Sequence, residues 1–535
     1  MNEFDFIVVG AGSSGCAVAR RLSDNPSFRV LLIEAGDPPS GFWLRTPAGM
    51  AKMFSENKFN WSFKTEQVPD ACNRHMVWPR GKTLGGSSAI NGMVYTRGVR
   101  YDYDHWRDLG NPGWGWNDVL PVFRRLEHNS RLGPMVGTDG PQKVSDPAVT
   151  PRLIFDFIES AAKCCNIPIA NNLSADGLEA TGMLQASIWK GKRQSSYDSY
   201  IRPIQSRENL TILTGSHVLK LNVNGDSVLG VGVLTKGISK KYLARKETIL
   251  SAGAIGSPHL LLLSGIGNSD ELKQAGIAPA VHLPGVGKNL QDHYSSQIKI
   301  RTGPKSSHNQ RLRTWRKYME GARYLVDGSG YLACGATLAG ALVKSSPDLE
   351  HADLDIGFRP ISMTYAPSGK VVIDKLDAFS LSVFVCKPKS RGEISLGSAD
   401  PLQPPKIHPG YFSDPDDMTA HVRGMRICRE ILAEKPLTFN VLDELAPGTS
   451  LGSDEELANY IRTTGKTSFH VSGTCKMGND PMAVVDSRLR VHGLKNLRVV
   501  DASIMPAVTS ANTNAPALMI GEMGSEMILQ DHGVK

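Results

Sequence analysis

The sequence predicts an α/β protein with two large domains. At 535 residues the chain is too long for one ordinary core and long enough for two. Near its start, FDFIVVG (residues 4–10) is typical of a buried strand, the turn GAGSSG follows, and CAVARRL is typical of a helix. A second apolar strand, RVLLIEAG, comes next. A glycine-rich turn between a strand and a helix, followed by another strand, indicates a Rossmann-like first domain.

The glycine-rich turn has the residue types that bind a dinucleotide. Gly10 permits the tight turn, Gly12 lets a pyrophosphate approach the backbone, and Gly15 allows close helix packing. The helix N-terminus then offers unpaired N–H groups to phosphates. Glu34 ends the second strand, where a carboxylate accepts hydrogen bonds from both ribose hydroxyls and disfavours NADP. Only one such fingerprint is found, and an enzyme that uses NAD against a flavin usually has two, so FAD is favoured over NAD.

Composition and the start of the chain narrow the classes of protein. A net charge of +8, with a pI near 8.9, is small for a chain of this length and does not indicate the concentrated basic face of a nucleic-acid-binding protein. The longest apolar run, residues 260–263, is far shorter than the roughly 18 residues that span a bilayer. MNEFDFIVVG leads directly into a strand without a signal peptide, and the eight cysteines are scattered. We therefore expect a cytoplasmic protein that binds no nucleic acid and contacts a membrane at most peripherally.

A second stretch of small residues, RGKTLGGSSAINGMVYTR at residues 80–97, has no hydrophobic period. A flexible linker is the simplest interpretation. Arg80 and Lys82 suit phosphate, however, and aromatic and apolar residues resume immediately. A backbone pressed against a ligand explains this mixture better than a linker does.

This stretch resembles a signature of the glucose-methanol-choline (GMC) family of FAD-dependent oxidoreductases. The similar motifs are GKTLGGSSAIN, GAIGSPHLLLLSGIG (residues 253–267), HVSGTCKMG (470–478) and DASIMPAVTSANTNAPALMIGE (501–522). Their order along the chain also matches, from residue 4 to beyond residue 525. The bacterial choline dehydrogenase and hydroxymethylfurfural oxidase branch is most similar, through LPGVGKNLQDH and VHGLKNLRVVDASIMP.

The resemblance implies which residues surround FAD. Those expected near the ADP half are Gly10, Gly12, Ser13, Ser14, Glu34, Ala35, Val218 and Ala252. Those expected along the pyrophosphate and the flavin are Arg80, Gly81, Gly85, Gly86, Asn91, Gly92, Met93, Phe469, Asp501, Ala502, Thr513 and Asn514. Some members attach FAD covalently through a histidine of the GGSS loop. Ile90 stands at that position here, so we expect FAD to be bound non-covalently.

The stretch TSFHVSGTCKMG (residues 467–478) groups His470, Cys475 and Met477, which allows a metal site, a reactive thiol or a general base. HExxH and CxxC pairs are absent, so we expect no metal, and Cys475 is more typical of a small buried residue. Oxidation of an alcohol by a flavin needs a base that removes the hydroxyl proton as hydride leaves for N5. The resemblance gives this role to His470, with Asn512 as the partner that orients the substrate oxygen.

The hypothesis is oxidation of an alcohol, in the first place a primary one, to the aldehyde. Electrons would pass to oxygen, a quinone or a cytochrome rather than to NAD. A hydroxynitrile lyase of the same fold is the alternative. Val471 stands where choline-type enzymes often have proline, which weakens inference about the substrate.

Two other features have simpler expectations. His293, in NLQDHY, is expected to be structural or solvent-facing and is assigned no chemistry. The basic stretch RLRTWRKYMEGARYL (residues 311–325) is expected to be a solvated face, with contact to a membrane surface or an electron-acceptor partner as the alternative.

The map of motifs divides the chain into segments. Residues 1–150, 195–300 and 465–535 are expected to form a Rossmann-like FAD-binding domain, and residues 151–194 and 301–464 an α+β substrate domain. FSLSVFVCKPKSRGEISL (379–396) alternates like antiparallel strands, and in this family a sheet there covers the flavin. NAPALMIGEMGSEMIL (514–529) is expected to be a helix whose N-terminus faces the flavin and whose methionines lie in the core.

Overall fold

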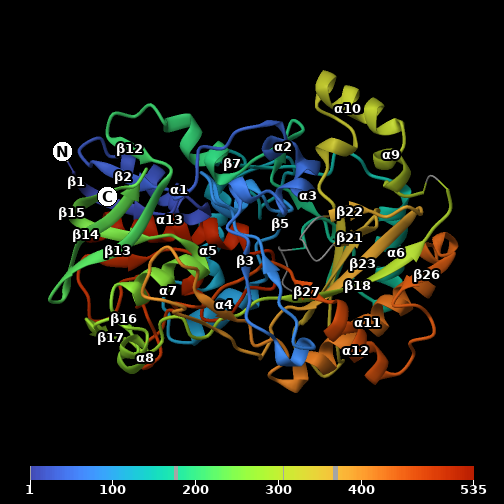
Figure 1. Ribbon diagram of the computed structural model, residues 1–535. Helices are drawn as coiled ribbons and strands as arrows, with labels where there is room; N and C mark the ends of the chain where they lie inside the picture. The colour runs from blue at the N-terminus through green and yellow to red at the C-terminus, as the bar shows by residue number, and fades with distance from the viewer. Residues whose placement is uncertain (1, 174–178, 305, 366–370, 535) are drawn as a thin grey trace.

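The computed structural model describes residues 2–173, 179–304, 306–365 and 371–534. Its described residues include two seven-stranded sheets, which lie at opposite ends of the molecule in Figure 1. Both termini lie beside the first sheet, and the second sheet is built from the middle of the chain. The predicted α/β class is confirmed.

The first sheet has the order β12-β2-β1-β15-β14-β13, and β28 also pairs with β15. Its central strand β1 (Glu3–Val9) is parallel to β2, β2 to β12, and β15 to β28, whereas β13, β14 and β15 form an antiparallel meander. The last six side chains of β1 are buried, and all of them except Asp5 are apolar, as expected for a strand covered on both faces. Asp5 is paired with Arg245 at 3.0 Å. The other strands are β2 Val30–Ile33, β12 Leu210–Leu213, β13 Ser216–Asn224, β14 Ser227–Thr235, β15 Ile238–Leu250 and β28 Leu497–Val499.

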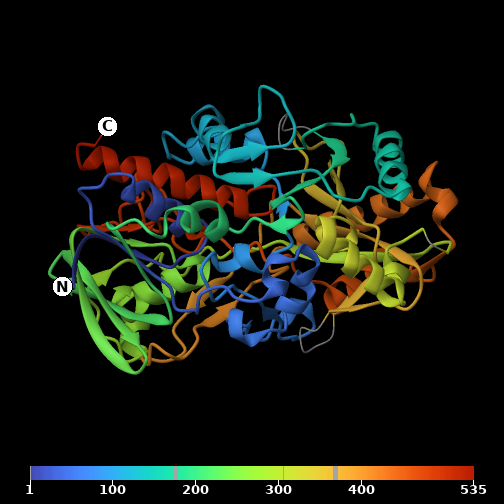
Figure 2. The ribbon, with the colours of Figure 1, turned by 90° about the horizontal axis from the view of Figure 1, so that it is seen from above.

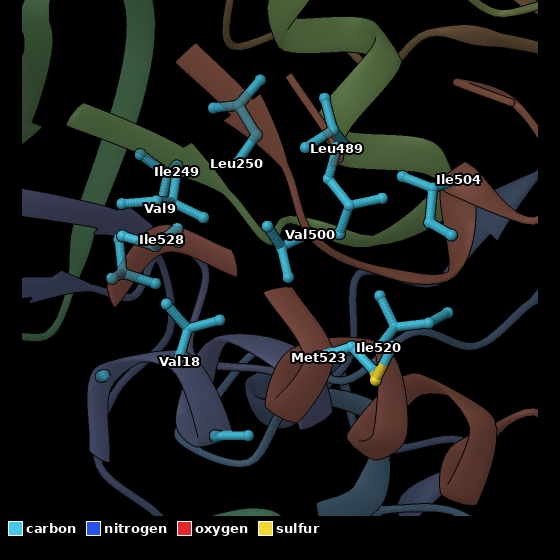
Figure 3. Close-up of a cluster of buried hydrophobic side chains, with 14 of the residues drawn as sticks. Val9, Val18, Ile249, Leu250, Leu489, Val500, Ile504, Ile520, Met523 and Ile528 are labelled. Carbon is cyan, nitrogen blue, oxygen red and sulfur yellow. The ribbon is translucent and has the colours of Figure 1, made fainter. Parts of the chain in front are cut away.

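Two helices, α1 (Ser13–Ser23) and α13 (Asn514–Asp531), pack side by side against this sheet. Figure 3 shows Val18 of α1 and Ile528 of α13 close to Val9 of β1. A Cβ at Gly521 would lie 2.7 Å from the Ser14 carbonyl oxygen, so glycine is what allows the two helices to approach this closely. The methionines of α13 are buried as predicted.

The second sheet has the order β26-β18-β23-β20-β19-β8, with β27 also paired to β18, and its pairs are antiparallel. Strand β23 (Ala378–Val385) begins one residue before the segment predicted to form antiparallel strands, 379–396, and all eight of its side chains are buried. The other strands are β8 Ala180–Met183, β18 Tyr294–Arg301, β19 Ala339–Val343, β20 Leu354–Arg359, β26 Asp443–Ala446 and β27 Lys466–Thr467. Helices α6 Arg152–Cys165 and α11 Pro415–Ala433 pack on it, and α12 Asp454–Thr464 packs on α11.

Shorter elements connect the two sheets. The remaining helices are α2 Phe42–Arg45, α3 Met50–Met53, α4 Arg100–Asp108, α5 Trp116–Leu126, α7 Gly253–Leu263, α8 Ser269–Gln274, α9 Asn309–Arg313 and α10 Arg316–Asp327. The remaining strands pair two by two: β3 Phe63–Lys64 with β4 Val77–Trp78, β5 Val94–Tyr95 with β9 Gln185–Ala186, β6 Glu127–Asn129 with β7 Gln142–Val144, β10 Ile188–Trp189 with β11 Lys192–Arg193, β16 Ile266–Gly267 with β17 Val281–His282, β21 Met363–Tyr365 with β22 Val371–Ile373, and β24 Glu393–Ser395 with β25 Lys406–His408. No helix in the described ranges combines the length and apolar character that crossing a bilayer requires.

The predicted domain boundaries stay a prediction. Strands β18 and β27 pair within the second sheet, although the predicted FAD-binding segments 195–300 and 465–535 contain most of β18 and all of β27. The chain therefore passes from one sheet to the other close to residues 293 and 468. Ser468 lines the cavity described next, and His293 lies behind its wall, in contact with His470.

Candidate active site

A cavity of about 650 Å³ joins the N-terminal glycine turn to the HVSGTCKMG segment. Every residue predicted to bind the cofactor or to act in catalysis lies in its wall, with the exception of Gly85. Gly85 lies behind the wall, where its N–H donates to the Ala11 carbonyl oxygen at 2.7 Å. The structure therefore brings segments from four parts of the chain to one space, while the individual roles stay predictions.

One end of the cavity is formed by Glu34 at the end of β2. Its Oε2 accepts from the Ala11 N–H at 3.1 Å and its Oε1 from the Gly36 N–H at 2.9 Å. Burial raises the pKa of this carboxyl group to about 7, against the lowering effect of these hydrogen bonds. The side chain is thus fixed with its remaining lone pairs available to ribose hydroxyls.

The glycines at this end serve two different purposes. A Cβ at Gly15 would lie 1.9 Å from the Gly10 carbonyl oxygen, and one at Gly86 would lie 2.7 Å from the Gly12 Cα. These two positions are glycine because the protein packs against itself there. A Cβ at Gly12 itself would find its nearest atom 3.9 Å away, so Gly12 faces open space in the cavity. The protein's own packing gives no reason for glycine at position 12, whereas a bound ligand would.

The N-terminus of helix α13 also reaches the cavity. Thr513, Asn514 and Ala517 line it, and the hydroxyl groups of Ser13 and Ser14 tie α1 to α13. Ser13 Oγ donates to Asn514 Oδ1 at 2.7 Å, and Ser14 Oγ donates to the Ala517 carbonyl oxygen at 2.6 Å. Two helix N-termini therefore share one wall, and each presents N–H groups to an anionic ligand.

Arg80 lies at the other end of the cavity rather than beside the glycine turn. Its Nη1 donates to the Phe469 carbonyl oxygen at 2.8 Å, and its buried Nη2 has no hydrogen-bond partner among the described residues. Burial lowers the pKa of this guanidinium group, which nevertheless remains a cation at neutral pH. Ile90 also lines the wall, as a buried aliphatic side chain packed with Leu44 and Met53.

His470 is buried and makes a polar contact through each of its nitrogens. Its backbone N–H donates to Asp292 Oδ1 at 2.7 Å. Its ring Nε2 lies 2.8 Å from Asn512 Nδ2, and its Nδ1 lies 2.8 Å from His293 Nδ1. Asn512 is held in turn by Thr96, whose Oγ1 accepts from the Asn512 N–H at 3.2 Å. The predicted pair His470 and Asn512 is therefore in direct contact on the cavity wall.

His293, expected to be structural or solvent-facing and assigned no chemistry, is not solvent-facing and lies in direct contact with His470. It is fully buried, its Nε2 lies 2.8 Å from the Cys386 carbonyl oxygen, and its ring stacks on Phe384 with centroids 4.5 Å apart. No sequence signal marks this residue, although its neighbour Asp292 also reaches His470, whose backbone N–H donates to the Asp292 carboxylate. Asp292 and His293 both contact His470 because the fold brings together two segments that are 177 positions apart in the chain.

One arrangement of hydrogens satisfies all of these contacts. The Cys386 carbonyl oxygen only accepts, so His293 Nε2 carries the hydrogen and a neutral His293 has a lone pair on Nδ1. His470 Nδ1 must then carry the hydrogen between the two rings, which leaves a lone pair on His470 Nε2. Asn512 Nδ2 donates to that lone pair.

Both rings are neutral in this environment. Burial lowers the pKa of His470 well below 6.5, and the neighbouring His293 and Arg80 lower it further. Burial lowers the pKa of His293 to about 4. His470 Nε2 is consequently an unprotonated nitrogen on the wall of the cavity at neutral pH, as a general base must be before reaction.

The residues present fit FAD. Gly12 offers accessible backbone, two helix N-termini share the wall, and Arg80 adds a cation to it. The described residues contain no group of three His, Cys, Asp or Glu side chains placed to hold a metal ion. Cys475 is fully buried, and burial raises the pKa of its thiol well above the usual range, in agreement with a packing role.

A dinucleotide-binding turn and a histidine–amide pair on the wall of one cavity define a dinucleotide-dependent oxidoreductase. The comparisons with known proteins give the family. Two models of the GMC oxidoreductase family match residues 4–295 and 388–521. The chain belongs to this family of FAD-dependent enzymes, and the predicted class of enzyme, a GMC-type alcohol dehydrogenase or oxidase, is confirmed.

Similar proteins cover nearly the whole chain. An alcohol dehydrogenase [acceptor] from Pseudomonas putida is 38% identical over 98% of this chain and 96% of its own. An oxygen-dependent choline dehydrogenase from Rhizobium etli is 37% identical with the same coverage. The crystal structure of pyridoxine 4-oxidase from Mesorbium loti superposes with a TM-score of 0.88 at 31% identity, over 99% of this chain and all of that one. The resemblance to the choline dehydrogenase branch is thereby confirmed.

Proposed function

We propose that this protein oxidises a primary alcohol to the aldehyde with FAD as the bound oxidant and His470 as the base. The observation that carries the proposal is the lone pair on His470 Nε2, held beside the Asn512 amide on the wall of the cavity. The similar proteins support it, because their names describe enzymes that act on an alcohol, choline and pyridoxine.

The proton moves between the substrate and His470. The alcohol oxygen takes a position between His470 Nε2 and Asn512 Nδ2, whose direct contact of 2.8 Å it replaces. The hydroxyl group then donates to His470 Nε2 and accepts from the Asn512 amide, which cannot itself take a proton at neutral pH. As the C–H bond breaks, the hydroxyl proton passes to His470 Nε2. Bound FAD would supply the oxidant for the hydride, the hydrogen and two electrons that leave the alcohol carbon.

The other side chains prepare His470 for this step. His293 accepts the His470 Nδ1 hydrogen and so keeps the lone pair on Nε2. Asp292 holds the His470 backbone through Oδ1, and its Oδ2 accepts from Thr467 Oγ1 at 2.5 Å. The Arg80 cation lies beside the segment that carries His470, where it favours negative charge on the bound oxidant or on the substrate oxygen.

The cavity favours a neutral alcohol over choline. Near His470 its wall includes Phe469, Val471 and Phe54, whose ring lies 5.2 Å from that of Phe469. Of the described residues in this wall, Glu34 and Asp501 carry carboxylates, and both are already held by backbone N–H groups. A quaternary ammonium group would find no free carboxylate among the described residues of this wall and would depend on aromatic rings alone. We therefore propose an alcohol with an aliphatic or aromatic body.

The cofactor is proposed to be held without a covalent bond, because the buried Ile90 stands where a histidine would attach it. The electrons are proposed to pass to an acceptor other than NAD, namely oxygen, a quinone or a cytochrome. Reoxidation of the alcohol-reduced enzyme by oxygen and by an artificial dye distinguishes an oxidase from a dehydrogenase.

Anaerobic mixing of the purified enzyme with benzyl alcohol, 1-hexanol and choline tests the reaction. We expect the flavin absorbance to bleach with the neutral alcohols and the matching aldehydes to appear, with choline reacting more slowly. Faster bleaching with choline would contradict the proposed substrate class but not the reaction. If no alcohol bleaches the flavin and mandelonitrile is cleaved instead, the protein is a hydroxynitrile lyase and the proposal is wrong.

A further inference from the structure

Helix α10 exposes an apolar face to solvent. The helix and its N-cap residue carry apolar side chains at positions 315, 318, 319, 325 and 326, and this spacing places them on one face. A surface helix of a globular protein normally turns such a face toward the core. Here all five are exposed: Trp315 66%, Tyr318 71%, Met319 59%, Leu325 73% and Val326 86%.

The opposite, more polar face of α10 attaches the helix to the protein. Glu320 and Tyr324 are its buried residues. Tyr324 Oη donates to the Gly191 carbonyl oxygen at 2.9 Å, and Glu320 Oε2 accepts from the Tyr331 N–H at 3.2 Å. Because these polar contacts fix the rotation of the helix, its apolar face cannot turn inward without breaking them.

Helix α2 extends the apolar surface. Phe42 and Trp43 are 46% and 39% exposed, and the Phe42 ring lies 5.8 Å from the ring of Tyr324. Figure 1 shows α10 projecting from the top of the molecule beside α2, and Figure 2, seen from above, shows the yellow α10 next to the blue segment that contains α2. We name this the α2–α10 surface, made of Phe42, Trp43, Trp315, Tyr318, Met319, Leu325 and Val326.

Basic side chains border the α2–α10 surface. Residues 309–327 carry five basic and two acidic side chains, and one of the acidic ones, Glu320, is buried and paired with Arg311 at 3.5 Å. Lys52 Nζ lies 5.5 Å from the centre of the Trp43 ring, on the α2 side. The basic residues of the α9–α10 segment are Arg311, Arg313, Arg316, Lys317 and Arg323.

We propose that the α2–α10 surface docks on an anionic lipid bilayer. Tryptophan, tyrosine and aliphatic side chains on one face of a helix, with basic residues beside them, are the composition of helices that lie in the membrane interface. The basic border matches the negative potential of anionic lipids. A second copy of this chain fits less well, because a symmetric contact would bring two such basic borders together. The proposal does not depend on the proposed reaction.

Co-sedimentation of the FAD-loaded enzyme with vesicles tests the proposal. We expect binding to vesicles of phosphatidylglycerol and phosphatidylcholine, at least tenfold weaker binding to pure phosphatidylcholine, and loss of binding at high salt. The double variant Leu325→Glu/Val326→Glu should bind the anionic vesicles at least tenfold more weakly. Leu132→Glu/Ile238→Glu is the matched control, because both are apolar side chains outside this surface, 87% and 61% exposed, and this variant should bind as the wild type does.

Three outcomes would overturn the proposal. The first is no binding of the wild-type enzyme to anionic vesicles. The second is equal binding by the wild type and the Leu325→Glu/Val326→Glu variant. The third is a wild-type dimer that this variant converts to a monomer in the absence of any vesicle binding, which would assign the surface to a second copy. An unchanged flavin spectrum, unfolding temperature and rate with a water-soluble alcohol show that the variant is folded.

Discussion

His293 Nδ1 lies 2.8 Å from His470 Nδ1, so two ring nitrogens of the same kind share one hydrogen. The Cys386 carbonyl oxygen, 2.8 Å from His293 Nε2, determines which ring supplies it. A carbonyl group fixed by the second sheet thus sets the tautomer of a histidine on the cavity wall through one intervening imidazole. This chain of contacts adds an orienting residue, His293, to the proposed base, His470.

Substitution of His293 tests the orientation. His293→Leu removes the acceptor for the His470 Nδ1 hydrogen, so the lone pair on Nε2 is no longer enforced. We expect FAD to stay bound and flavin reduction by alcohol to fall by about 10- to 100-fold, the usual range for losing a residue that orients a functional histidine. His293→Asn, whose Oδ1 can accept the same hydrogen, should recover part of the rate. Equal rates for the Leu and Asn variants, measured by anaerobic stopped flow, would contradict the orienting role.

Substitution of His470 tests the base. His470→Ala should retain FAD and lose flavin reduction by about 10²- to 10⁴-fold, the range of general base catalysis. Because the pKa of His470 is well below 6.5, the wild-type rate should also remain constant from neutral into mildly acidic solution. Cys475→Ala is the control from the same motif and should keep its rate, since the buried thiol lies in the core rather than in the cavity wall. Equal losses in both variants would reopen the question of which residue reacts.

The cofactor-binding end of the cavity could be predicted from the sequence, whereas the contact between His293 and His470 could not. Gly10, Gly12 and Glu34 act through a local strand–turn–helix unit, so their spacing alone indicates their geometry. The contact between His293 and His470 depends on how two segments 177 positions apart cross between the sheets, and no local pattern encodes it.

The orientation of helix α10 could not be predicted from the sequence either. The sequence shows that this stretch is basic, but it does not say which face of the helix turns toward the protein. That choice depends on Gly191 and Tyr331, the backbone partners of Tyr324 and Glu320, which lie on other segments of the chain. A solvated basic face was therefore expected where the structure has an exposed apolar one.

The buried His421 is expected to make the protein less stable in acid. His421 of α11 is 1% exposed, its Nε2 has no partner among the described residues, and burial lowers its pKa to about 3. Its pKa in the unfolded chain is about 6.5, so the unfolded state binds more protons between these values. The stability it provides is complete above pH 6.5 and is lost as the pH falls toward 3, by roughly 1.4 kcal/mol per pH unit.

His421→Leu isolates this effect. When the pH is lowered from about 7.5 to about 5, the unfolding temperature of the variant should fall less than that of the wild type. The reason is that the variant binds one proton fewer on unfolding. His282→Leu, at an exposed position, serves as the control and should follow the wild type. Parallel curves for the wild type and His421→Leu would show that other groups control the acid response.

Release of FAD tests the non-covalent attachment. Acid precipitation of the purified enzyme should leave all of the flavin in the supernatant, because the side chain at position 90 is isoleucine. The measurement is the amount of flavin that passes a filter before and after the enzyme is denatured. Flavin that remains in the protein pellet would show attachment through a different residue.

Two glycines of the same turn separate folding from cofactor binding. A Cβ at Gly15 would lie 1.9 Å from a backbone oxygen of Gly10, whereas one at Gly12 would have 3.9 Å of free space. Gly15→Ala should therefore fail to fold or unfold at a much lower temperature, whether or not FAD is present. Gly12→Ala should leave the unfolding temperature of the FAD-free protein unchanged and weaken FAD binding by at least tenfold, since the new methyl group occupies space that a pyrophosphate needs. Titration of FAD into the stripped proteins measures the second effect. Wild-type FAD affinity in Gly12→Ala would mean that the phosphates do not lie against this turn.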